Sequence, residues 1–118
     1  MTTREQITDL LERVEGATAD DQYSTIYTVL SKLWPEAPPA VWGMLSAGGY
    51  ESVALALLAC VLPGWCKSVV DLSPDELCEA YVWQRGWTHN IKGTGITGAL
   101  AILSAMLRAM IAEMSDAS

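Results

Sequence analysis

The stretch that decides the fold runs from Cys78 to Lys92 and reads CEAYVWQRGWTHNIK. If Arg85 and Gly86 form a two-residue turn, the two arms pair as antiparallel strands with Val82 opposite His89. One face then carries Cys78, Ala80, Val82, Trp87 and Ile91, with His89 on this side or at its rim. The other face carries Glu79, Tyr81, Trp83, Thr88, Asn90 and Lys92. One register thus gives an apolar face, an amphipathic face and an opposed Glu79–Lys92 charge pair, which predicts a hairpin.

A helix is the alternative for the first arm. Ser73, Pro74 and Glu76 are typical of a helix start, and Gly86 suits a helix end. The letters AYVW favour a strand, because they are rich in strand formers and have weak helical periodicity. With the strand, the segment from Ser73 to Glu76 becomes a turn or one short helical turn. The preceding WCKSVVD, residues 65–71, reads as another strand.

The rest of the chain has helical patterns. Thr3 and Gln6 form a capping box for a first helix that ends at Gly16. Asp20 or Asp21 can cap a second, which stops at Pro35. Its apolar stripe is Tyr23, Ile26, Tyr27, Leu30, Leu33 and Trp34. One helical turn is expected at 41–45. The segments 50–62 and 97–114 are apolar on nearly all sides, which implies burial on more than one face.

These elements predict one α+β domain over residues 1–118. The helical part spans 1–62, the three-stranded antiparallel sheet 64–92 and the terminal helix 97–114. The expected order is helix, helix, short helix, helix, three strands, helix. Packing the sheet between helices, in an α/β/α sandwich-like arrangement, is the economical way to bury both apolar helices.

The composition limits the class of partner. Fourteen acidic and seven basic residues give a net charge of −7, which repels nucleic acid and anionic lipid and suits a basic partner or simple solubility. The N-terminal stretch lacks an apolar signal core, and the longest apolar runs are too short for a membrane span. The three cysteines, Cys60, Cys66 and Cys78, are expected to be reduced core residues. We therefore expect a cytoplasmic protein that contacts no membrane.

Residues 93–98 read GTGITG and match the dinucleotide-binding pattern G-x-G-x-x-G. The fold that uses this pattern needs a second parallel strand with an acidic residue about twenty positions on, and here only a helix and a short tail follow. The fingerprint is therefore rejected. A weaker hypothesis is an anion site made by the backbone amides of Gly93, Thr94 and Gly95.

The other reactive side chains indicate no enzyme, no metal and no cofactor. His89 is the only histidine, so a metal site or a pairing with Cys78 as nucleophile is disfavoured. Asp75, Glu76 and Glu79 are better explained as residues of a solvated turn than as paired catalytic carboxylates.

Several segments resemble the phage ABA sandwich domain, a family of small proteins of tailed phages and prophages. They are GATADDQYSTI, YESVALALLACVLPGW, EAYVWQ and TGALAILSAMLRAMIAE. The resemblance implies helices on both faces of a small antiparallel sheet, a phage origin and a role in the host cytoplasm. It implies no catalytic residue and no cofactor. GTGITGAL departs from the Ala-Thr-Pro-like stretch that typically opens the last helix in this family.

The leading hypothesis is a non-enzymatic inhibitor of a host nucleic-acid-dependent defence, such as CRISPR, that occupies a basic surface without binding nucleic acid itself. The expected acidic surface is Asp20, Asp21, Glu36, Asp75, Glu76 and Glu79. Tyr81, Trp83 and Arg85 complete it, because aromatic and Arg side chains are enriched at interface hot spots. The alternatives are a phage assembly accessory that forms homo-oligomers through its apolar helices, and a binder of an anionic nucleotide signal.

Overall fold

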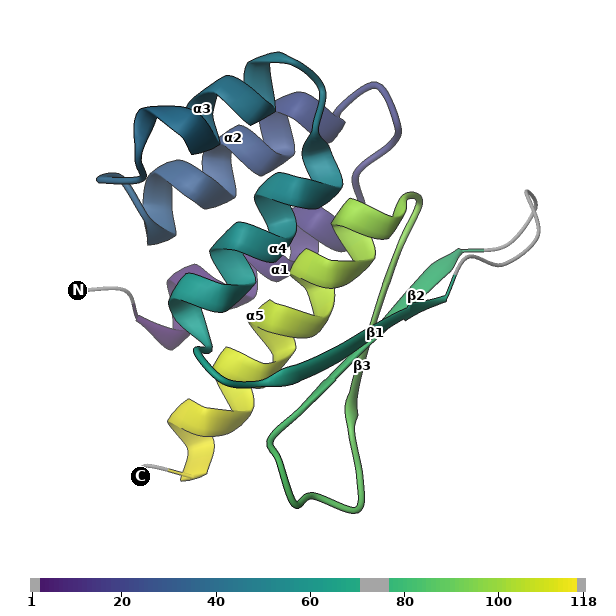
Figure 1. Ribbon diagram of the computed structural model, residues 1–118. Helices are drawn as coiled ribbons and strands as arrows, with labels where there is room; N and C mark the ends of the chain where they lie inside the picture. Colours follow the sequence, from purple (N-terminus) through teal and green to yellow (C-terminus); the bar gives the residue numbers. More distant parts are fainter. Residues whose placement is uncertain (1–2, 71–76, 117–118) are drawn as a thin grey trace.

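The computed structural model describes residues 3–70 and 77–116 (Figure 1). The helices are α1 (Arg4–Glu15), α2 (Gln22–Leu33), α3 (Pro39–Ser46), α4 (Tyr50–Val61) and α5 (Gly98–Asp116). The strands are β1 (Cys66–Val70), β2 (Cys78–Trp83) and β3 (Ile91–Gly95), which form one antiparallel sheet in the order β1-β2-β3. The predicted α+β class and element order are confirmed. Residues 78–83 are strand, and the expected turn at Ser73–Glu76 lies outside the described residues.

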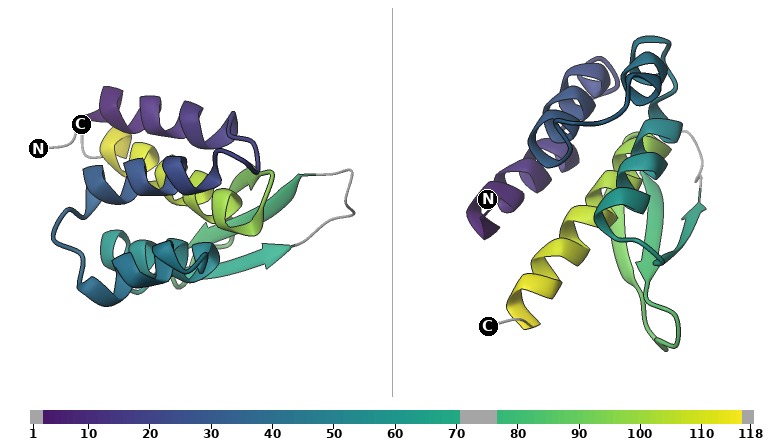
Figure 2. Two further views of the ribbon diagram at one scale, coloured as in Figure 1. Left: turned by 90° about the horizontal axis from the view of Figure 1, so that it is seen from above. Right: turned by 60° about the vertical axis from the view of Figure 1, so that its left-hand side comes forward.

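Helix α5 lies at the centre of the molecule. One side of it packs on β2 and β3, and the other contacts α1 and α4. Every residue from Ala99 to Leu107 is buried, which agrees with the apolar sequence of this helix. The described helices lie on one side of the sheet (Figure 2, right). Helix α5 is therefore the layer that has neighbours on both sides. The sequence had predicted instead that the sheet would lie between helices.

The β2–β3 register differs from the expected hairpin by two residues. Val82 lies opposite Ile91 instead of His89, and Glu79 lies opposite Thr94 instead of Lys92. Arg85 and Gly86 do form a turn, closed by a hydrogen bond from Trp87 N to Gln84 O, but only Gly86 has positive φ. A turn with positive φ at its second central residue alone is type II, which splays strands instead of pairing them directly. The chain therefore continues to Ile91 before pairing resumes.

Gly93 and Gly95 allow α5 to lie directly on β3. A Cβ atom on Gly93 would lie 2.0 Å from Ala105 N, and one on Gly95 would lie 2.7 Å from Ala101 N. The observed register places both glycines on the face of the sheet that carries the buried Ala80 and Val82. Small residues on this face therefore set how closely the helix approaches the strand.

The capping box of Thr3 and Gln6 and the end of α1 at Gly16 are confirmed. The expected stripe of α2 is partly wrong. Its buried residues are Thr25, Ile26, Val29 and Leu30. Tyr23 and Tyr27 are exposed and form a row of rings with the half-buried Trp42 of α3. Aromatic rings can lie on a surface when they stack on each other, so their helical spacing alone did not identify the core face.

The cysteines also differ from expectation, because none of them is fully buried. Cys60 is exposed, and Cys66 and Cys78 are half-buried; the three thiols form no disulfide with one another. Cys60 lies near the end of α4, whose buried residues are Val53, Ala54, Leu57 and Leu58. This helix therefore has an exposed side that its nearly uniform apolar sequence did not indicate.

Candidate functional site

The acidic residues predicted as an interaction surface do not form one patch. Asp20 and Asp21 precede α2 and Glu36 follows it, so the 12-residue helix separates them by about 18 Å. All three are exposed. Glu79 lies on the sheet, and Asp75 and Glu76 lie outside the described residues. The predicted surface is thus divided between at least two regions of the molecule.

Helix α1 carries an acidic stripe that the sequence interpretation missed. Glu5, Asp9 and Glu12 are exposed and follow the spacing i, i+4, i+7. This places them opposite the buried Ile7, Leu10 and Val14 of the same helix. Neither of the two ion pairs found between described side chains involves the stripe. The helical periodicity of the charged residues was the signal that could have identified it.

A surface hollow extends this stripe toward α2. It has a volume of about 390 Å³ and is lined by Glu12, Arg13, Gly16, Ala17, Asp21, Ser24 and Thr25. Glu12 of α1 and Asp21, the residue that precedes α2, therefore border the same hollow. Asp21 also holds the connecting loop, because its Oδ2 accepts a 3.0 Å hydrogen bond from Thr18 Oγ1. We call Glu5, Asp9, Glu12, Asp20 and Asp21 the acidic face.

The outer face of the sheet carries the predicted aromatic residues. Tyr81 and Trp83 are half-buried there, and Arg85 is exposed in the following turn. The Tyr81 hydroxyl donates a 2.9 Å hydrogen bond to Glu79 Oε1, and Lys92 Nζ lies 3.4 Å from Glu79 Oε2. The Glu79–Lys92 pair thus forms, diagonally across the strands. The hydrogen bond to the carboxylate, then burial and the nearby negative charge, raise the pKa of Tyr81.

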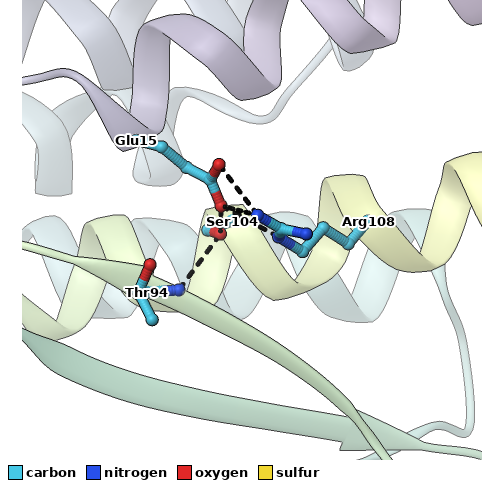
Figure 3. Close-up of polar contacts among 4 residues, drawn as sticks. All are labelled: Glu15, Thr94, Ser104 and Arg108. Atoms are coloured by element: carbon cyan, nitrogen blue, oxygen red, sulfur yellow. Dashed lines mark hydrogen bonds and ion pairs between the residues drawn. The ribbon is translucent and has the colours of Figure 1, made fainter.

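Three elements meet at a polar cluster around the buried Ser104 (Figure 3). Ser104 of α5 is fully buried; its Oγ donates to Glu15 Oε2 of α1 at 2.6 Å and accepts from the Thr94 backbone N–H of β3 at 3.1 Å. The Arg108 guanidinium forms two hydrogen bonds with the Glu15 carboxylate, at 2.9 and 3.0 Å. The Ser104 hydroxyl is thus engaged both as a donor and as an acceptor within the protein. The cluster joins α1, α5 and β3.

The same contacts bear on the anion site proposed at Gly93, Thr94 and Gly95. Gly93 and Gly95 are buried between β2 and α5, and the amide of Thr94 already donates to Ser104. An anion site needs several exposed amides that converge on one point. The segment is instead a strand covered by a helix, so the Thr94 amide cannot serve an external anion.

The remaining candidates for chemistry lie apart. His89 is exposed and stacks on Trp87 with ring centroids 4.4 Å apart. Cys78 Sγ lies 3.9 Å from the carbonyl oxygen of Ile96, at the far end of β2 from the loop that carries His89. Within residues 3–70 and 77–116, no group of three His, Cys, Asp or Glu side chains is arranged to hold a metal ion. In the same ranges, no helix is long and apolar enough to span a membrane.

Comparison with known proteins adds no further assignment. No protein-family model, no curated protein and no solved structure matches the chain. The resemblance to the phage ABA sandwich domain therefore stays a prediction from the sequence.

Proposed function

We propose that this chain is a non-enzymatic interaction protein whose acidic face binds a basic surface of a protein partner. The observation that carries the proposal is the outward stripe of Glu5, Asp9 and Glu12, which continues into the hollow shared with Asp21. These carboxylates have no cationic partner among the described side chains, in a protein of net charge −7. Complementary charge would steer a basic partner to this face.

A groove that normally holds nucleic acid is the basic surface we favour. The three carboxylates lie between Glu5 and Glu12 of α1. They provide about one negative charge per 5 Å of helix axis. A DNA strand provides one per roughly 3.4 Å, so the stripe offers a comparable line of charge to cationic side chains. Occupying such a groove would inhibit a nucleic-acid-dependent defence of a phage host, the partner class that we infer from the phage resemblance together with the negative charge.

The test is a binding and competition experiment with a purified CRISPR effector complex as the partner. Asp9→Asn/Glu12→Gln should lower the affinity about tenfold, and DNA binding by the complex should recover in parallel. Glu36→Gln/Glu51→Gln makes the same change in net charge on other elements, at exposed positions. We expect this control to change the affinity less than about twofold, because long-range charge is screened within about 8 Å at physiological salt. Equal effects of the two variants, or no complex with the unmodified protein, would contradict the proposal.

The two alternative functions receive less support. Self-association through α5 requires an exposed apolar surface on that helix, whereas its stretch from Ala99 to Leu107 is buried within one chain. Nucleotide binding at residues 93–95 requires free amides, and the Thr94 amide is engaged. Light scattering and melting with a nucleotide panel test these alternatives directly. A stable multimer or a nucleotide-dependent rise in melting temperature would favour them over the proposed function.

A further inference from the structure

A second hollow lies beside the C-terminal part of α5. Its volume is about 490 Å³, and it is lined by Val61, Leu62, Pro63, Trp65, Gln84, Met110, Glu113 and Met114. Aliphatic, methionine and tryptophan side chains form most of the wall. The only charged group among these residues is the Glu113 carboxylate. An apolar wall with one fixed charge is suited to a ligand that has an apolar stem and an oppositely charged end.

Glu113 has only a neutral partner among the described residues. Gln84 Nε2 donates a 2.6 Å hydrogen bond to its Oε1, and neither described ion pair includes it. The side chain is half-buried beside Met110 and Met114. Removing a carboxylate from water without a cation nearby is unfavourable. A cation that enters the hollow would compensate this loss of hydration.

Trp65 supplies a second group that attracts cations. Its ring borders the hollow and packs edge-on against Trp87, with centroids 5.2 Å apart. Trp87 in turn stacks on His89, and these neighbours restrict the orientation of the Trp65 ring. An indole ring and a carboxylate on the same hollow are two groups that attract an ammonium ion.

We propose that this hollow receives a lysine side chain of the protein partner. Met110, Met114 and Leu62 would cover the methylene stem, and Trp65 and Glu113 Oε2 would hold the ammonium group. Lysine fits better than arginine because Gln84 already donates to Glu113 Oε1. A guanidinium fork would have to share that oxygen with Gln84, whereas an ammonium group needs only Oε2. This inference rests on the proposed function, since it names an anchor on the same basic partner.

The experiment follows the Trp65 indole N–H signal by NMR during titration with three capped tripeptides. They are Leu-Lys-Leu, Leu-norleucine-Leu and Leu-Arg-Leu, which keep the apolar flanks and change only the central group. We expect the lysine peptide to bind about five- to tenfold more tightly than the norleucine peptide and more tightly than the arginine peptide. Equal binding of all three, tighter binding of arginine, or signal changes that occur away from the hollow would overturn the inference.

Two variants separate charge from folding. Glu113→Gln keeps an acceptor for Gln84 but removes the charge, so the preference for lysine over norleucine should disappear while norleucine binding is unchanged. Glu51→Gln removes a charge on α4, outside the hollow, and should leave the preference intact. A Glu113→Gln protein that keeps the full preference refutes the role of Glu113.

The two proposals can fail separately, because the hollow and the acidic face share no residue. If partner binding depends on Asp9 and Glu12 but the lysine peptide shows no preference, the lysine anchor fails alone. If the peptide binds as expected but the Asp9/Glu12 variant binds the partner normally, the acidic face fails alone.

Discussion

Replacing Gly93 by alanine tests whether the closeness of α5 and β3 determines stability. The new methyl carbon would lie 2.0 Å from Ala105 N, 2.6 Å from Ala105 Cα and 2.7 Å from Ala101 O. All three are backbone atoms of α5 within the buried stretch Ala99 to Leu107, so no side chain can rotate away to make room. Restoring an ordinary contact of about 3.5 Å requires the helix to move by more than 1 Å or the strand to bend.

The magnitude follows from two opposing terms. Overpacking a rigid core costs about 3 kcal/mol or more, whereas alanine in a strand recovers about 0.5 to 1 kcal/mol of backbone entropy relative to glycine. We expect a net loss of at least about 2 kcal/mol in the free energy of unfolding, or a melting temperature lower by roughly 8 °C. Gly95→Ala, with its nearest contacts at 2.7 Å, should lose less.

Urea unfolding followed by circular dichroism measures the effect, with Gly43→Ala as the matched control. Gly43 lies within α3, and a Cβ atom there would meet nothing within 4 Å. The same substitution should therefore stabilise the protein by up to about 1 kcal/mol through helix propensity. Adding Ala105→Gly to Gly93→Ala should give no rescue, because the clash is with the backbone. A Gly93→Ala protein within 0.5 kcal/mol of the unmodified protein (roughly the spread for surface substitutions), or rescue by Ala105→Gly, would refute the reasoning.

Three other measurements test separate features. Ser104→Ala should cost about 1 to 3 kcal/mol in urea unfolding, because the part-buried Thr94 amide loses its acceptor; an unchanged midpoint would contradict this. Absorbance titration should show Tyr81 ionising above its ordinary pKa of 10.0, and Glu79→Gln should lower that pKa; any stability from this bond is present below pH 10 and lost as pH rises through the folded-state pKa. Cys60 should react with a thiol reagent in the native protein faster than the half-buried cysteines, and uniform slow labelling would show otherwise.

The sequence was sufficient for the features that depend on local periodicity. The capping box of α1, the strand from Cys78 to Trp83 and the uniformly apolar α5 each follow from residues close together in the chain. The turn at Arg85-Gly86 was also predictable, and it forms. The type of this turn was not predictable, because the conformation of Gly86 depends on the residue at which β3 begins to pair with β2. The packing of α5 on Gly93 and Gly95 influences that register.

The candidate sites were harder to predict, because they combine residues from distant elements. Glu12 and Asp21 share a hollow because the chain reverses between α1 and α2. Gln84 meets Glu113 across 29 positions of sequence. Net charge alone directed attention to acidic residues in turns and missed the stripe on α1. The stripe is detectable from the sequence once charged residues are tested for helical periodicity as apolar residues are.

The position of the Glu113 hollow follows from the packing of α5. The helix has 19 residues and β3 has 5, so the helix is about 28 Å long and the strand about 17 Å. Contacts at residues 100–105 hold its first half on Gly93, Thr94 and Gly95 of β3. Its last turns therefore extend beyond β3, where Met110 and Glu113 meet Trp65 and Gln84 instead of a strand. A mutation that displaces the first half should move this wall of the hollow, so Gly93→Ala should weaken lysine-peptide binding even though Gly93 does not line the hollow.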